Sequence, residues 1–207
     1  MKWLAPALVA LALTGCAQLP GRPLVETLET REWRQVATPD DRDRIGNWRA
    51  TFIAARNDAI EGGNAAEIEA LGALGQPDAA IPYSPPPPGN YRCRTIKIGA
   101  RGENGLHYVD YPWFACRIRV EDDLLGFAKL TGSQRQVGLL MPDDDFRAIF
   151  LGTLVLGDEQ RAMRYSADPD RDVAGLLQKI DEAHWRLVLP EPRFESLTDI
   201  IELVPAE

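Results

Sequence analysis

The side chains of this sequence that could do chemistry include four arginines in two alternating pairs. Arg92 and Arg94 alternate along one short segment, and Arg117 and Arg119 alternate along another. Alternate residues of a strand share one face, so the four guanidinium groups would gather on one side of a sheet. There they could bind a carboxylate, a phosphate or an acidic protein partner. The alternative is that acids in residues 121–123 or in the N-terminal helices neutralise them within the chain.

Two lysines and a polar turn form a second group of candidates. Lys97 and Lys129 are two of only four lysines, and strand alternation would turn both towards apolar neighbours. A lysine inside a barrel could hold a ligand anion, whereas a lysine near the rim would extend its ammonium group into water. Ser133 and Arg135 complete the set of candidate interior polar residues. Lys129 and Ser133, with a carboxylate, could also serve a hydrolase at the barrel mouth, although a tight hairpin explains this turn equally well.

Recognisable catalytic and metal motifs are missing from the sequence. Ser133 does not stand in a G-x-S-x-G motif, and no phosphate-binding G-x-x-x-x-G-K-[ST] motif is present. His107 and His184 lack neighbouring metal ligands, and the acidic runs at residues 143–145 and 168–172 are typical of solvated turns rather than of a calcium loop. We therefore predict no catalytic residue, no cofactor and no metal site.

The N-terminus predicts export and lipid attachment. Lys2 precedes an apolar stretch over residues 3–13, and Leu13-Thr14-Gly15-Cys16 resembles a bacterial lipobox. Such processing would remove residues 1–15, acylate Cys16 and leave Ala17 as the second mature residue, which favours an outer-membrane lipoprotein facing the periplasm. The alternatives are a leader without lipid, giving a secreted or soluble periplasmic protein, and a transmembrane anchor. The apolar stretch is shorter than the ~20 residues that span a bilayer.

The remaining cysteines, Cys93 and Cys116, form an even pair in an oxidising compartment and predict a disulfide, with two free thiols as the alternative. Their midpoint falls between Asn104 and Gly105, the dipeptide that favours a two-residue type I′ hairpin turn. In strict register the two cysteines would face each other with Cα atoms ~5.5 Å apart. Pro112 cannot donate to the ladder, so an irregularity is expected there.

The same register would place Arg92 directly opposite Arg117 on the other face of the sheet. Like charges in this position repel unless an acid neutralises them. The arginine face is therefore either a site for an anion or a set of internal ion pairs.

Helices are expected in the N-terminal part of the chain. Thr38 followed by Pro39 and two acids is typical of a helix start, and apolar side chains then recur at three- and four-residue spacing up to Gly62. A weaker pattern over residues 26–37 predicts a short helix. Asn64, with a glutamate three residues later, predicts the capped start of another.

Beyond a proline-rich connector, the hydrophobic period changes to that of strands. Nine runs rich in β-branched and aromatic residues follow, at residues 91–98, 113–120, 124–131, 134–141, 146–156, 160–165, 173–180, 184–189 and 197–204. Short turns with no helix between them predict an α+β protein in which the N-terminal helices precede an eight- or nine-stranded antiparallel, lipocalin-like β-barrel; a β-sandwich is the alternative. An eight-stranded barrel is filled by side chains or holds one small ligand.

The predicted organisation has four parts along the chain. They are a lipoprotein signal peptide (1–15), a lipid-anchored helical segment (16–81), a proline-rich linker (82–90) and the antiparallel β-barrel domain (91–207).

Five motifs lie in these segments in a characteristic order. They are Tyr91-Arg92-Cys93-Arg94, the run from Phe127 to Arg135, Phe150-Leu151-Gly152, Trp185-Arg186-Leu187-Val188 and Asp199-Ile200-Ile201-Glu202-Leu203. In this order they resemble a family of bacterial proteins, domain of unknown function 4893, from about Trp33 to Pro205. The family carries no established activity, so the resemblance implies no catalytic residue.

Composition limits the classes of function. The chain of 207 residues is 45% hydrophobic and 26% charged, and its formal net charge of -8 argues against nucleic acid as the main partner, because phosphate binding needs a basic face. We predict an envelope lipoprotein that acts as a non-catalytic binding module for a small hydrophobic or anionic ligand or for an envelope protein. The alternatives are an unrecognised hydrolase and a protease-inhibitor-like barrel. Such an inhibitor inserts a free N-terminal strand into the cleft of the enzyme, and an acylated Cys16 would hinder that insertion.

Overall fold

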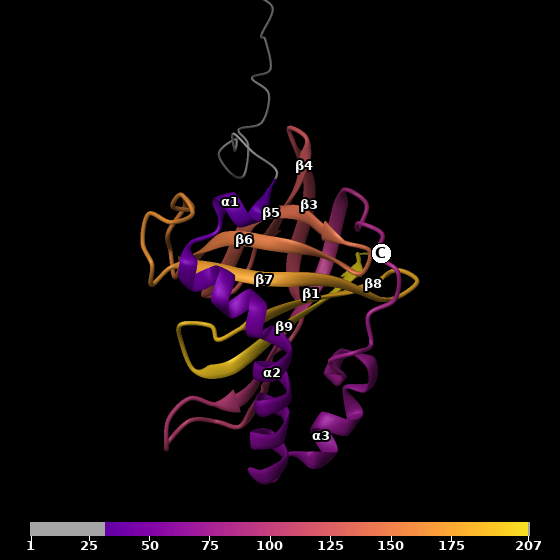
Figure 1. The fold of residues 1–207 in the computed structure, drawn as a ribbon, viewed down its shortest axis with the longest axis vertical. Coiled ribbons are helices and arrows are strands. Elements are labelled where there is room, and N and C mark those ends of the chain that lie inside the picture. Colours follow the sequence, from indigo (N-terminus) through magenta and orange to yellow (C-terminus); the bar gives the residue numbers. More distant parts are fainter. Residues whose placement is uncertain (1–31, 207) are drawn as a thin grey trace, which may run out of the picture.

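The computed structural model describes residues 32–206. The predicted signal peptide, the acylation site Cys16 and the segment up to residue 31 lie outside these residues. Within them, a group of helices packs against one side of a β-barrel (Figure 1). No helix in residues 32–206 is long and apolar enough to cross a membrane.

The helices begin and end where local signals predict. They are α1 (Trp33–Val36), α2 (Pro39–Glu61) and α3 (Ala65–Ala70), followed by the 3-10 turn η1 (Gly72–Gly75). The predicted start of α2 is confirmed, because Thr38 Oγ1 accepts a hydrogen bond from the amide of Asp41 and a proline occupies the first turn. The predicted start of α3 is confirmed, because Asn64 is its N-cap residue, but the predicted capping hydrogen bond from the Asn64 side chain does not form.

Nine strands follow the helices. They are β1 (Gly89–Ala100), β2 (Tyr108–Asp110), β3 (Phe114–Glu121), β4 (Leu124–Lys129), β5 (Gln134–Asp144), β6 (Arg147–Leu156), β7 (Asp172–Asp181), β8 (His184–Pro190) and β9 (Ser196–Pro205). The sheet order is β2-β1-β3-β4-β5-β6-β7-β8-β9, and β1 also pairs with β9. The predicted α+β fold with an antiparallel barrel is therefore confirmed. Eight strands close the barrel, and β2 is an extra strand on the edge of β1.

The strand assignment differs from the prediction in one segment. Residues 160–165 lie in the loop between β6 and β7 instead of forming a strand. Met163 is 47% exposed, so this run has no apolar face to bury against the barrel. The short strand β2, three residues long, was not predicted because it has no alternating pattern of its own.

The predicted disulfide between Cys93 and Cys116 is present, with Cα atoms 5.8 Å apart. The predicted register is wrong by two residues, because Cys93 pairs with Phe114 and Cys116 pairs with Tyr91 in the ladder. A slip of two residues keeps each side chain on its predicted face. Both cysteines therefore point into the barrel.

The turn between β1 and β3 explains the slip. Asn104 and Gly105 do not adopt the positive φ angles of a type I′ turn, whereas Gly102 has φ of 87°. The chain returns through a longer loop over residues 101–107 and then through β2. The strand is interrupted at residues 111–113, where the irregularity at Pro112 was expected.

Two apolar cores lie on the two sides of the barrel wall. The barrel interior is filled by Tyr91, Cys93, Cys116, Ile118, Phe127, Leu140, Ala148, Phe150, Leu177, Trp185, Leu187, Leu189, Ile201 and Leu203. The second core joins helix residues such as Phe52 to outward-facing strand residues such as Ile96. Burial on both faces explains why several strands are apolar almost throughout.

The proline-rich connector closes one end of the barrel. Trp185 Nε1 donates a hydrogen bond to the carbonyl of Ser84 (2.8 Å), and the amide of Tyr83 donates to the carbonyl of Asp145 (2.7 Å). The predicted linker therefore packs against the barrel at the end formed by the β5–β6 turn.

Arg186, the neighbour of Trp185, fastens the helical segment to the outer wall. Its side chain is fully buried, and Nε donates to Gln178 Oε1 (3.0 Å). The terminal nitrogens donate to the main-chain carbonyls of Ala73, Leu74, Gln76 and Pro77. Burial lowers the pKa of Arg186 to about 10, so the guanidinium stays protonated at neutral pH. One side chain thus satisfies carbonyls that the end of η1 leaves open.

Candidate functional site at the open end of the barrel

The four predicted arginines lie on the outer face of the barrel. Arg92, Arg94, Arg117 and Arg119 alternate with the buried cysteines of β1 and β3 and point away from the interior. The expected opposition of Arg92 and Arg117 is wrong, because Arg92 lies opposite Ala115 in the shifted register.

Two of these arginines are paired within the protein. Arg94 Nε donates to Glu202 Oε2 (2.8 Å), and its Nη1 donates to Asp110 Oδ2 (2.8 Å). Arg119 Nε lies 4.0 Å from Glu121 Oε1. Internal pairing, the alternative to an anion site, therefore applies to Arg94 and Arg119.

The four candidate interior residues are divided between the inside and the outside. Lys97 and Lys129 are each 5% exposed. Ser133 is exposed in the turn before β5. Arg135 alternates with interior glutamines and donates instead to the Glu159 carbonyl (2.7 Å). Ser133 and Arg135 therefore do not contribute to the interior, because one precedes the strand and the other lies on its outer face.

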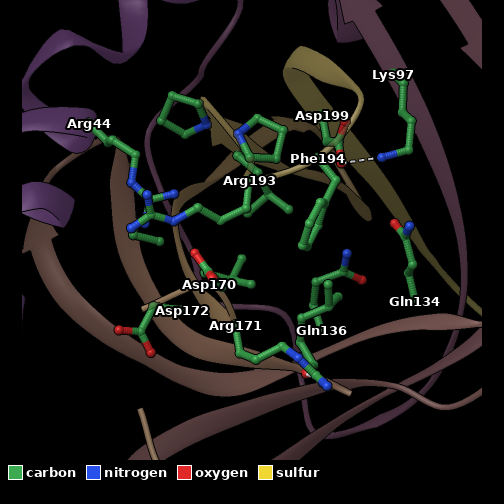
Figure 2. Close-up of a pocket in the computed structure, with 16 residues that line it drawn as sticks. Arg44, Lys97, Gln134, Gln136, Asp170, Arg171, Asp172, Arg193, Phe194 and Asp199 are labelled. Atoms are coloured by element: carbon green, nitrogen blue, oxygen red, sulfur yellow. Dashed lines mark hydrogen bonds and ion pairs between the residues drawn. The ribbon is translucent and has the colours of Figure 1, made fainter. Parts of the chain in front are cut away.

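The barrel end opposite the connector contains a small cavity. It lies under the loops at residues 157–171 and 191–195, which join β6 to β7 and β8 to β9. Its volume is about 30 Å³, room for one or two water molecules. Its charged and amide lining residues are Arg44, Lys97, Gln134, Gln136, Asp170, Arg171, Asp172, Arg193 and Asp199 (Figure 2). Lys129 is not a lining residue, but its charge interacts with those of Lys97 and Asp199, which are. Loops as long as the first of these are commonly functional.

Lys97 forms a buried ion pair in the wall of this cavity. Its Nζ lies 3.0 Å from Asp199 Oδ2 and 3.2 Å from Glu195 Oε2. Lys97 and Asp199 are direct cross-strand partners on β1 and β9. Burial alone would lower the pKa of Lys97, but the two carboxylates outweigh it and raise this pKa. The sequence could have assigned Asp199 to the interior, because Asp199 lies two residues before Ile201 on the same strand and Ile201 faces the interior.

Lys129 is buried and forms no direct ion pair with an acid of the described residues. Its Nζ donates to the main-chain carbonyl of Gln134 (3.0 Å) and lies 3.9 Å from the centre of the Phe114 ring, but it forms no ion pair within residues 32–206. Burial and, to a smaller extent, the charge of Lys97 lower the pKa of Lys129 to about 8, although the charge of Asp199 acts in the opposite direction. The cations that line the cavity do have acidic partners, in the ion pairs Arg44–Asp41, Lys97–Asp199, Arg171–Glu159 and Arg193–Asp40.

Two buried polar atoms near these lysines also lack partners. Gln136 Oε1 and Thr95 Oγ1 form no hydrogen bond to any described residue. Gln136 lines the cavity, and Thr95 precedes Lys97 on the inner face of β1. Buried polar atoms are rarely left unsatisfied in native proteins. The open end therefore combines one buried ammonium group that forms no ion pair in the described residues with unused hydrogen-bonding capacity.

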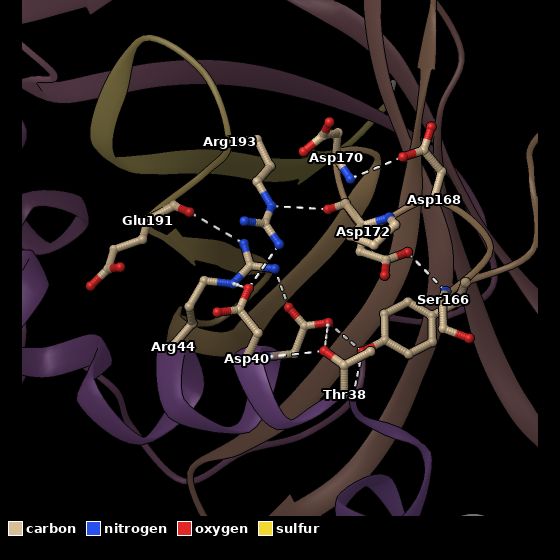
Figure 3. Close-up of polar contacts among 12 residues, drawn as sticks. Thr38, Asp40, Arg44, Ser166, Asp168, Asp170, Asp172, Glu191 and Arg193 are labelled. Carbon is tan, nitrogen blue, oxygen red and sulfur yellow. Dashed lines mark hydrogen bonds and ion pairs between the residues drawn. The ribbon is translucent and has the colours of Figure 1, made fainter.

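A polar network holds the two loops over this end (Figure 3). Tyr165 of the first loop donates a hydrogen bond to Asp41, which is fully buried at the start of α2. Arg193 of the second loop donates to Asp40 Oδ2 (2.8 Å) and to the carbonyl of Pro169 (2.9 Å). Helix α2 therefore anchors both loops. The sequence did not predict this role, because these acids also suit the first turn of any helix.

The structure does not bring together the side chains that the hydrolase alternative requires. A lysine that activates a serine needs a hydrogen bond between the two side chains, and none joins Lys129 to Ser133 in the described part of the chain. Nor do three His, Cys, Asp or Glu side chains of residues 32–206 converge closely enough to hold a metal ion. The arrangement can bind an anion through charge and hydrogen bonds.

One of three comparisons with known proteins gave a match, and it confirms the predicted family. Neither a search of curated proteins nor a search of solved structures gave a match. A family model covers residues 33–203, most of the chain and the whole of the barrel except its last two residues. The chain belongs to the family described as Domain of unknown function (DUF4893).

Proposed function

We propose that this protein is a non-catalytic binding module of the bacterial envelope that holds a small anionic group at the open end of its barrel. The observation that carries the proposal is Lys129, a buried ammonium group with no carboxylate partner in residues 32–206. Burying an unpaired charge destabilises a protein by several kcal/mol. A bound carboxylate or phosphate would compensate this charge.

The filled interior argues against the carriage of a large apolar ligand. Carriers of drug-sized molecules use cavities of roughly 300–1,000 Å³. The cavity at the open end is about 30 Å³, and aromatic rings such as Phe127 and Phe150 pack edge to face deeper in the barrel. The ligand we propose is therefore a carboxylate or phosphate group that enters the cavity only in part, free or at the end of a larger molecule.

An envelope location is part of the same proposal. The Leu13–Cys16 motif supports acylation of Cys16 and attachment to the outer membrane on its periplasmic side. The disulfide between Cys93 and Cys116 supports an oxidising compartment. The acidic net charge of -8 gives no attraction to anionic lipid, so the lipid chains would supply the attachment.

The test is a titration with sodium acetate and with inorganic phosphate, followed by amide chemical shifts in the NMR spectrum. We expect saturable shifts at Gln134, Gln136 and Asp199 in the native protein. Lys129→Met should weaken the affinity about tenfold, because one charge-assisted contact is lost. Lys179→Met is the matched control, since Lys179 lies at the other end of the barrel on β7. Equal affinity in the two variants would refute the site.

A further inference from the structure

The outer face of β1 and β3 carries two arginines that the protein does not neutralise. Arg92 is exposed and forms no ion pair within residues 32–206. Arg117 donates to Asn90 Oδ1 (3.1 Å), a neutral acceptor, and likewise has no carboxylate partner in the described residues. The net charge of the chain is -8, but the acids at this face pair with Arg94 and Arg119 and not with Arg92 or Arg117. The face therefore has a local positive potential on an acidic protein.

The ladder sets the spacing of these two arginines. Arg92 lies opposite Ala115, and Arg117 lies opposite Asn90. Arg92 and Arg117 are therefore diagonal neighbours on one face, and their backbone positions are about 7–8 Å apart. Ala115 is small, so no bulky side chain stands between them. Two residues of an extended peptide that point the same way are about 6.8 Å apart, which matches this separation.

An exposed tryptophan adjoins the two arginines. Trp113 is 41% exposed, and its ring lies 4.9 Å from the Arg92 guanidinium carbon and 5.3 Å from that of Arg94. Because Arg94 is itself held by Glu202, the ring is supported by an immobilised side chain. Tryptophan and arginine are the residues most enriched at the centres of protein interfaces. The ring offers a fixed apolar contact beside the charged groups.

We propose that Arg92, Trp113, Ala115 and Arg117, which we call the β1–β3 surface, dock an extended acidic segment of a partner protein. Carboxylates at alternate positions of that segment pair with Arg92 and Arg117, and an apolar side chain of the segment packs on Trp113. Charge complementarity and the matching spacing favour this occupant. A membrane surface is disfavoured, because binding to anionic lipid needs a larger basic cluster than two arginines.

The experiment measures binding of defined peptides to the full chain by isothermal titration calorimetry. The probe is a seven-residue peptide, capped at both ends, in which glutamates alternate with leucines. One control peptide has glutamines in place of the glutamates, and the other has the same composition with consecutive glutamates. We expect the alternating peptide to bind at least about tenfold more tightly than either control.

Protein variants locate the contact. Arg92→Ala and Arg117→Ala should each weaken binding of the alternating peptide about tenfold. Arg161→Ala is the matched control, because Arg161 is exposed on the loop between β6 and β7 and its removal changes the net charge equally. It should leave the affinity within about twofold. The double variant R92E/R117E should lose the acidic peptide and gain affinity for a peptide in which lysines replace the glutamates.

Three results would each overturn the proposal. One is an equal loss of affinity in Arg161→Ala, which would indicate unspecific charge attraction. Another is equal binding of the consecutive-glutamate peptide, since the spacing argument would then be wrong. The third is an absence of peptide binding together with Arg92-dependent binding to phosphatidylglycerol vesicles, which would assign this surface to the membrane. Circular dichroism and unfolding midpoints of the variants show whether each of them is folded.

Discussion

Replacement of Lys129 by methionine shows how much the buried charge destabilises the folded protein, separately from what this charge contributes to anion binding. Methionine has a similar length and no charge, so it can occupy the space beside the Phe114 ring without an ammonium group. The main-chain carbonyl of Gln134 loses its donor in this variant, a loss of about 1 kcal/mol that does not depend on pH. The difference in the free energy of unfolding between the native protein and Lys129→Met therefore changes with pH because of the charge of Lys129.

The size and sign of the effect follow from the pKa of Lys129. Burial lowers this pKa from 10.5 to about 8 in the folded protein. At 1.36 kcal/mol for each pH unit, the charged form destabilises the folded state by roughly 3 kcal/mol. Below pH 8 this penalty is fully present. Between pH 8 and 10.5 the unfolded chain binds a proton that the folded chain does not, so the free energy of unfolding rises with pH.

The assay is urea unfolding, followed by tryptophan fluorescence at pH 7 and pH 10.5, on chains that begin after Cys16. We expect the native protein to gain about 3 kcal/mol relative to Lys129→Met between the two pH values. Relative to Lys179→Met the gain should stay below about 0.5 kcal/mol. A difference between the native protein and Lys129→Met that does not change with pH would refute the buried charge and, with it, the anion site. Saturating acetate should reduce the gain, because a bound anion raises the pKa of Lys129.

Three further predictions concern the scaffold and the anchor. The double variant Cys93→Ser/Cys116→Ser should lower the free energy of unfolding by about 3 kcal/mol, because a loop closed over 23 positions is released; an unchanged urea midpoint without reductant would contradict a structural bridge. Arg186→Met should destabilise the protein by about 4 kcal/mol and speed amide exchange in residues 72–77, and unaltered exchange there would argue against the clamp. Cys16→Ser should move the protein from the membrane fraction to the soluble envelope fraction, and persistent membrane association would remove the lipid anchor.

The parts of the fold that were predictable are those with local causes. Thr38 and Pro39 mark the start of α2 because capping depends on neighbouring residues alone. Alternation along β1 assigned Arg92 to the outside and Cys93 to the inside, and the assignment survived the slip because the slip was even. The slip itself was not predictable, since it depends on a loop whose conformation is coupled to β2 and to Gly102.

The candidate site was only half predictable for the same reason. Strand alternation placed Lys97 and Lys129 inside the barrel, but the acid that pairs with Lys97 is Asp199, which lies far along the chain on β9. Closure of β1 on β9 brings the two together, and no local pattern encodes that closure. Lys129, in contrast, contacts a carbonyl and an aromatic ring and forms no ion pair within residues 32–206, which becomes evident only when every neighbour is placed.

Sequence alone determined the order of the helices and of the eight strands that close the barrel, the faces of the residues in β1 and β3, the cysteine pair and the family, because these depend on neighbouring residues or on parity. Tertiary structure alone decided which end of the barrel the connector covers, which arginines pair with acids and which buried lysine of residues 32–206 forms no ion pair. These outcomes depend on contacts between residues about a hundred positions apart, as between Trp185 and Ser84, and such contacts exist only after the barrel has closed.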